Sequence, residues 1–213
     1  MLTEKMEEYT PEMDQLLFYL PLAGSAFKKI YYDEVMERAV AKFVPAEDLV
    51  VPYFATDLLS CERISHVVRM SENDIIKRQK AGFYRDIELK PAQPKQDEIQ
   101  KKYDELEGIT PTADRPTNFN ILEMHVDLDL EEYEIEDAPK NVKVPYIVTI
   151  DEGSSQILSI YRNYQPFDET YKRKEYFVHF KFLPGLGFYG FGLIHMIGGL
   201  SKTATAALRQ LLD

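Results

Sequence analysis

The sequence predicts an α+β fold with antiparallel or mixed β-sheets and several helices. Strand-like segments of alternating apolar and polar residues follow one another along the chain, and the helical segments are grouped apart from them, which is typical of this class. Hydrophobic residues make up 45% of the sequence, which is enough for a substantial core. The length of 213 residues allows one large domain or two small ones, and we expect one domain over residues 1–213.

The first 82 residues predict a short helix, several strands and a second helix. Pro11 and Glu12 after Thr10 favour a helix start, because proline fits the first helical turn and a carboxylate is stabilised at the positive end of the helix dipole. This helix is expected to reach Tyr19, before the break at Gly24. The predicted strands are residues 26–32 and 38–44, which form a hairpin, 49–54, an edge strand because it contains Pro52, and 64–70. The second helix is capped by Ser71, reaches Lys80 and is closed by Gly82.

Residues 90–118 are rich in charged residues, glutamine and proline, and predict a polar insertion with a helix over residues 97–107. A second β region follows. Its predicted strands are residues 121–133, 145–150, 157–162 and 176–182, with turns at residues 139–141 and 151–153.

The composition excludes several classes of function. The formal net charge of −11 disfavours a surface that grips nucleic-acid phosphates, because such binding needs clustered Lys and Arg. Cys61 is the only cysteine, so the chain can form neither an intrachain disulfide nor a cysteine-based zinc cluster. No apolar run reaches the roughly 18 residues of a membrane span, and residues 1–10 are too acidic for a signal peptide.

A glycine-rich stretch near the C-terminus is the best match to a known motif. Gly185, Gly187 and Gly190 satisfy the G-x-G-x-x-G pattern directly after a predicted strand. A dinucleotide site also needs a helix that starts at the third glycine, whereas the sequence predicts a helix only from Ser201, its N-cap. We therefore favour an aromatic-packed loop, and keep a nucleotide-binding enzyme as the alternative.

The helix over residues 201–213 has no stop signal, which suggests that it continues in a longer protein.

One predicted strand carries His125, Asp127, Asp129 and Glu131 at alternate positions, an arrangement that could bind a metal ion. A solvated acidic face opposite an apolar face explains the pattern better, because no second ligand cluster is visible. The same acidic face allows a further alternative, an acidic protein-interaction domain.

The remaining candidate side chains are isolated in the sequence. His66, His179 and His195 are expected to be structural, Cys61 to be a buried apolar residue, and the hydroxyls of residues 201–205 to serve in capping. We therefore assign no catalytic, cofactor-binding or metal-binding residue, and we do not expect an enzyme.

Several runs of residues resemble one known family, the portal (head-to-tail connector) proteins of short-tailed bacteriophages. The resembling runs are LPLAGSAFKKIYYD (20–33), FVPAEDLVVPY (43–53), RISHVVRMSENDI and GFYRD (within 63–86), PYIVTID (145–151), and FLPGLGFYGFGLIHMIGGLSKTATAALRQLLD (182–213). They span nearly the whole chain, and the insertion carries little of the resemblance.

The resemblance implies a wing-like α+β fold and a structural subunit without catalytic residues or cofactors. Such subunits form a ring, typically of twelve copies, at one capsid vertex, where DNA is packaged and ejected. Capsid, terminase (packaging-motor) and tail proteins dock on the ring, and double-stranded DNA passes through it without sequence-specific binding. The resemblance also implies that the chain covers an N-terminal, mostly wing, portion, and that it belongs to the virion after assembly in the bacterial cytoplasm.

Overall fold

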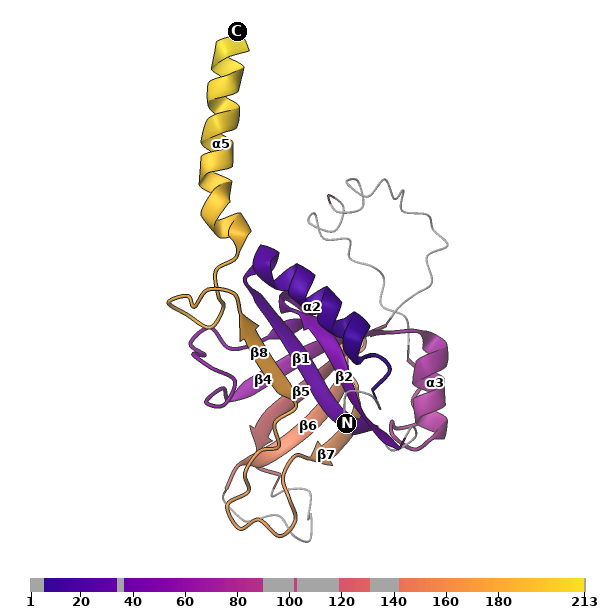
Figure 1. Ribbon diagram of the computed structural model, residues 1–213. Coiled ribbons are helices and arrows are strands. Elements are labelled where there is room, and N and C mark those ends of the chain that lie inside the picture. Colours follow the sequence, from indigo (N-terminus) through magenta and orange to yellow (C-terminus); the bar gives the residue numbers. More distant parts are fainter. Residues whose placement is uncertain (1–5, 34–36, 90–101, 103–118, 131–141, 213) are drawn as a thin grey trace. The chain divides into compact units, whose positions relative to one another are not determined.

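The structure, a computed structural model, describes residues 6–33, 37–89, 102, 119–130 and 142–212 (Figure 1). The chain divides into two compact units. Unit 1 comprises Met1–Ile64 and Lys172–Asp213, and unit 2 comprises Ser65–Tyr171. Each unit contains helices and an antiparallel sheet, so the predicted α+β class is confirmed.

Unit 1 is built on a three-stranded antiparallel sheet in the order β2-β1-β8. Its elements are α2 (Tyr9–Ala23), β1 (Ser25–Asp33), β2 (Arg38–Pro45), the short 3-10 helix η1 (Ala46–Asp48), β3 (Leu49–Val50), β8 (Phe177–Lys181) and α5 (Leu193–Leu212). The predicted hairpin is confirmed as β1 and β2, with Phe27 opposite Val44. Helix α2 starts slightly earlier than predicted, with Glu8 as N-cap, and continues past the predicted end at Tyr19 to Ala23, followed by Gly24 in the left-handed conformation.

Two carboxylates of the α2 region form hydrogen bonds with β2, an edge strand of the sheet. Glu8 accepts hydrogen bonds from the guanidinium of Arg38 and the amide of Ala41, and Glu12 accepts one from the amide of Phe43. The Arg38 hydrogen bond is the main reason that the pKa of Glu8 lies below its ordinary value. These bonds satisfy outward-facing amides of an edge strand, which would otherwise be available to another chain.

The core of unit 1 lies under the sheet and draws on both ends of the chain. Its buried residues are Phe27, Val44, Leu49, Cys61, Ile64, Phe177 and Phe188. Phe177 and Phe188 come from beyond residue 171, so the C-terminal part of the chain is needed to complete the core of the N-terminal part.

Two predictions in unit 1 are wrong. The strand predicted over residues 49–54 ends at Val50, because Pro52 opens a turn in which its carbonyl accepts the amide of Ala55. Helix α5 starts at Leu193, eight residues before Ser201, and continues through Gly198 and Gly199. Glycine disfavours a helix by about 1 kcal/mol but does not forbid one, so two glycines were weaker stop signals than the prediction assumed.

Unit 2 contains the sheet order β4-β5-β6-β7 and the helix α3. The elements are β4 (Arg63–Met70, from Ser65 on in this unit), α3 (Glu72–Lys80), β5 (Phe119–Leu128), β6 (Val144–Asp151) and β7 (Ile157–Arg162). The predicted cap is confirmed, since the Ser71 hydroxyl accepts the amide of Asp74 at 3.3 Å, and Gly82 follows with a φ of +78°.

Two hydrophobic clusters stabilise unit 2. The first contains Met70, Ile75, Tyr84, Phe119, Ile121 and Leu158, and the second contains Val144, Tyr146, Val148 and Tyr164. Apart from Lys102, the polar insertion at residues 90–118 with its predicted helix lies outside the described residues, as do the turn at residues 139–141 and Glu131.

Candidate functional site

The glycine-rich stretch is held against the end of α2 by direct backbone contacts. A Cβ atom added to Gly192 would lie 2.3 Å from the carbonyl oxygen of Leu22, and one added to Gly24 would lie 2.4 Å from the amide nitrogen of Gly192. One added to Gly190 would lie 2.6 Å from the carbonyl oxygen of Gly24. Only glycine fits at these three positions, so these glycines let two backbone segments touch, rather than leaving room for a ligand.

Amides in this stretch are already bound within the protein. The Gly190 amide donates to the Ser25 hydroxyl at 2.8 Å, and the Phe191 amide donates to the Leu183 carbonyl at 2.8 Å. The Gly192 amide donates to Nδ1 of His195, a side chain in the first turn of α5. Although α5 begins nearer to the G-x-G-x-x-G pattern than predicted, these three N–H groups are not available to cradle a pyrophosphate.

His179 forms a cluster of three rings with Phe27 and Phe188, which joins the loop to the sheet. Its ring centroid lies 4.4 Å from that of Phe27 and 4.8 Å from that of Phe188, and its Nε2 lies 3.1 Å from the Ser25 hydroxyl oxygen. Burial, with a smaller effect of nearby Lys181, lowers the pKa of His179 to about 4. The ring is therefore neutral at pH 7 and serves as a structural residue, as the sequence predicted.

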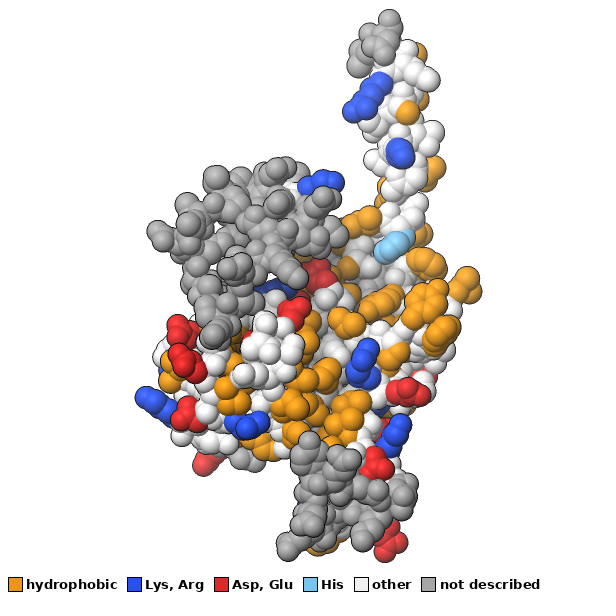
Figure 2. All heavy atoms as spheres, turned by 180° about the vertical axis from the view of Figure 1, so that it is seen from behind, with side chains coloured by type: hydrophobic (Ala, Val, Ile, Leu, Met, Phe, Trp, Pro, Cys, Tyr) orange, Lys and Arg blue, Asp and Glu red, His pale blue; other side chains and the backbone are white. Residues whose placement is uncertain are grey.

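Helix α5 exposes its side chains on all sides. Every described residue from Ile194 to Leu211 is exposed, including six large apolar ones: Ile194, Met196, Ile197, Leu200, Leu208 and Leu211. In Figure 2 hydrophobic side chains are visible along one edge of this helix. An isolated helix with this much exposed apolar surface is typical of an element that binds a partner.

Two loops of unit 1 expose a second group of large apolar side chains, which we call the loop patch. It consists of Val50, Tyr53, Phe54, Leu59, Leu186 and Tyr189. Val50 ends β3, the next three belong to the segment between β3 and β4, and the last two belong to the glycine-rich loop. The Tyr189 hydroxyl donates to the Leu49 carbonyl at 3.2 Å and so joins the two loops. Hydrophobic side chains gather on the right in Figure 2, where these loops lie.

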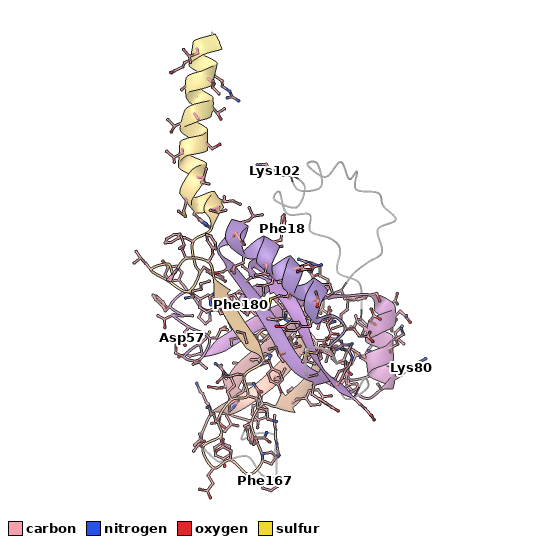
Figure 3. All side chains as sticks on the ribbon, viewed as in Figure 1. Phe18, Asp57, Lys80, Lys102, Phe167 and Phe180 are labelled. Carbon is pink, nitrogen blue, oxygen red and sulfur yellow. The ribbon has the colours of Figure 1, made fainter. Side chains whose placement is uncertain are left out.

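The first loop is held in a fixed conformation by Arg173. Its guanidinium donates to the carbonyl oxygens of Leu58 and Cys61 at 2.7 Å and of Leu59 at 3.2 Å. Asp57, labelled in Figure 3, accepts the Ser60 amide at 2.7 Å. The sequence predicted an edge strand over residues 49–54, so a loop that exposes Tyr53 and Phe54 was not expected. Pro52 was the one signal that the strand would end.

The strand face around His125 differs from the solvated acidic face that was predicted. His125 is only 2% exposed, and it lies 2.9 Å from Glu123 Oε1 and 3.4 Å from Asn163 Nδ2. Asp127 is exposed, and Asp129 lies just beyond the end of β5. In the part of the chain that the structure describes, no group of three His, Cys, Asp or Glu residues is placed to hold a metal ion.

The remaining candidates have structural environments. Cys61 is buried, its thiol donates to the Arg63 carbonyl, and burial raises its pKa, so it is a poor nucleophile at neutral pH. His66 lies half-buried on β4. Contrary to prediction, Ser201 does not cap a helix. It lies inside α5, where its carbonyl accepts the Thr205 hydroxyl, and Thr203 bonds Gly199 in the same way.

No family model matches the chain, and no curated protein is significantly similar to it in sequence. None of the described helices is both long enough and apolar enough to cross a membrane.

Proposed function

We propose that the chain is a structural subunit of a bacteriophage portal ring, without a reaction of its own. In this role it is part of the conduit for DNA packaging and ejection at one capsid vertex of the virion. It also contributes to the platform on which the terminase motor and the tail proteins dock. Assembly takes place in the cytoplasm of the bacterial host, and twelve copies are the expected number.

The observation that carries this proposal is α5, whose apolar side chains are exposed from Ile194 to Leu211. Water-exposed leucines and isoleucines on a 20-residue helix favour a protein that works in an assembly. The rigid loop patch, a second exposed apolar surface, supports the same conclusion.

The residues that resemble portal proteins add support, because two of their runs meet in the fold. The run over residues 20–33 contributes Gly24, and the run over residues 182–213 contributes Gly190 and Gly192, which contact it through backbone atoms. The net charge of −11 fits a conduit, since strong phosphate binding would oppose the movement of DNA.

The proposal is tested by the assembly state of the full chain, measured by analytical ultracentrifugation and negative-stain electron microscopy. We expect rings. A monomer at high concentration, across a range of salt concentrations, would refute the proposal. Genes for a packaging ATPase and a capsid protein beside this gene are the expected genomic context.

The alternative of a nucleotide-binding enzyme is tested by calorimetric titration with dinucleotides and ATP. We expect no saturable binding, because the amides of Gly190, Phe191 and Gly192 are already bonded. Saturable micromolar binding that disappears in Gly187→Val would favour the enzyme.

The second alternative, an acidic protein-interaction domain around Asp127, is weakened by the burial of neighbouring His125.

A further inference from the structure

We infer that the loop patch of one copy of this chain binds helix α5 of a second copy. The inference rests on the proposed function and deepens it, because it names the two surfaces through which neighbouring subunits contact each other. Four properties of the described residues support it: exposure, spacing, rigidity and charge.

Both surfaces are exposed and apolar, and neither covers the other within one chain. Tyr53 and Phe54 are 94% and 90% exposed, while Leu208 and Leu211 on α5 are 61% and 81% exposed. Large aromatic side chains at such exposure are typical of the anchor residues of protein interfaces. Because the two surfaces do not cover each other within one chain, they can be buried against each other only when a second copy binds.

Four of the six large exposed apolar residues of α5 have the spacing of a helix that packs along one line, whereas Met196 and Leu200 lie outside this spacing. Ile194, Ile197, Ala204, Leu208 and Leu211, together with Ser201, are three or four residues apart in strict alternation. This spacing keeps the side chains on a single stripe. The middle of the stripe is Ser201 and Ala204, whose small side chains leave room for bulky aromatic ones such as Tyr53 and Phe54.

The loop patch is a preformed surface, which lowers the entropic cost of binding. Arg173 binds three carbonyl groups of the first loop, and Asp57 binds the Ser60 amide. Tyr53 and Phe54 also support each other, with ring centroids 5.2 Å apart at 85°. Tyr189 ties the second loop to Leu49.

The charges around the two surfaces are complementary. Residues 46–62 contain Glu47, Asp48, Asp57 and Glu62 and no Lys or Arg, so this segment remains acidic even with the guanidinium of Arg173 bound to it. Helix α5 contains Lys202 and Arg209 and no Asp or Glu. Lys202 and Arg209 are two helical turns apart and lie on one side of the stripe, where they can face the acidic rim of the patch. Pairing of α5 with α5 would bring these like charges together instead, which favours the patch as the binding surface.

The contact joins two different surfaces, so each copy has one patch and one helix to offer. A contact of this head-to-tail type does not stop at two copies, and it closes into a ring if the rotation between neighbours divides a full turn. The proposed site therefore accounts for a closed ring without any further interface.

The test is disulfide cross-linking between copies of the full chain in a Cys61→Ser background. One tagged variant carries Ala204→Cys on α5, and one untagged variant carries Thr56→Cys, which leaves Tyr53 and Phe54 in place. The matched control replaces Thr56→Cys with Phe167→Cys, a residue of unit 2 that is 97% exposed. Each mixture is first sedimented under reducing conditions and then oxidised.

We expect tagged–untagged dimers with Thr56→Cys and none with Phe167→Cys. In a parallel measurement, Phe54→Asp should weaken association by about 10-fold or more, whereas Phe167→Asp should leave it unchanged. Dominant links between two Ala204→Cys chains would show that α5 pairs with itself and would overturn the inference. Rings that form without the Thr56 link would overturn it while leaving the portal proposal intact. Chains that neither assemble nor cross-link would overturn both.

Discussion

Replacement of Gly192 by alanine tests whether the glycine-rich stretch is a backbone packing site. The new Cβ would lie 2.3 Å from the Leu22 carbonyl oxygen and 2.6 Å from the Gly24 amide nitrogen, about 1 Å closer than ordinary van der Waals contact. Both neighbours are backbone atoms and cannot rotate away. The end of α2 and the start of α5 must separate, and we expect a loss of about 3 kcal/mol in the free energy of unfolding, the upper end for overpacking.

Gly187→Ala is the matched control, because nothing lies within 4 Å of the added Cβ in the same loop. This change should leave stability the same or raise it by up to about 1 kcal/mol, through the entropy of the unfolded chain. Urea unfolding followed by far-UV circular dichroism measures both variants. With a slope of about 2 kcal/mol/M, the midpoint of Gly192→Ala should be about 1.5 M lower than that of Gly187→Ala. Equal midpoints would refute the packing argument.

Three further predictions concern other parts of unit 1. The pKa of His179 is about 4 in the folded state, below its ordinary value of 6.5, so folding disfavours protonation of the ring. The contribution of His179 to the free energy of unfolding should therefore be complete above pH 6.5 and should fall by about 2 kcal/mol toward pH 4, after allowance for the partial exposure of the ring. His179→Gln should flatten this part of the plot of urea midpoint against pH. Arg173→Ala removes three hydrogen bonds to carbonyl groups, so it should lower the free energy of unfolding by about 2 kcal/mol and speed proteolysis in residues 53–62. If the variant is cleaved no faster than the unmutated chain, Arg173 does not hold this loop. Gly198→Ala should raise the helicity of α5, because nothing lies within 4 Å of the added Cβ atom and alanine favours a helix over glycine by about 1 kcal/mol. An unchanged circular dichroism signal would count against a helix at this position.

Local signals in the sequence were sufficient for many of the elements. The β1–β2 hairpin, β4, the Ser71 cap with α3, and the strands β5, β6, β7 and β8 follow from alternation, turn residues and capping, which act over a few neighbouring residues. The aromatic-packed nature of the loop at residues 185–190 was also predicted, because bulky Phe188 and Tyr189 do not suit a phosphate site. Phe188 is indeed buried in the core.

The tertiary structure decided what those signals could not. Gly190 and Gly192 are required because Gly24 and Leu22, more than 160 residues away, lie against them, and no local pattern reports such a contact. His125 is buried although Glu123 and Asp127 on the same strand are acidic, and Asn163, the residue that follows β7, lies beside it. Tyr53 and Phe54 were expected in a strand and are instead exposed in a loop, and Arg173, more than 110 residues away, binds three carbonyl groups of that loop. The sequence thus determined the elements, whereas long-range contacts determined which apolar residues remain exposed on the loops and on α5 and are available to a partner.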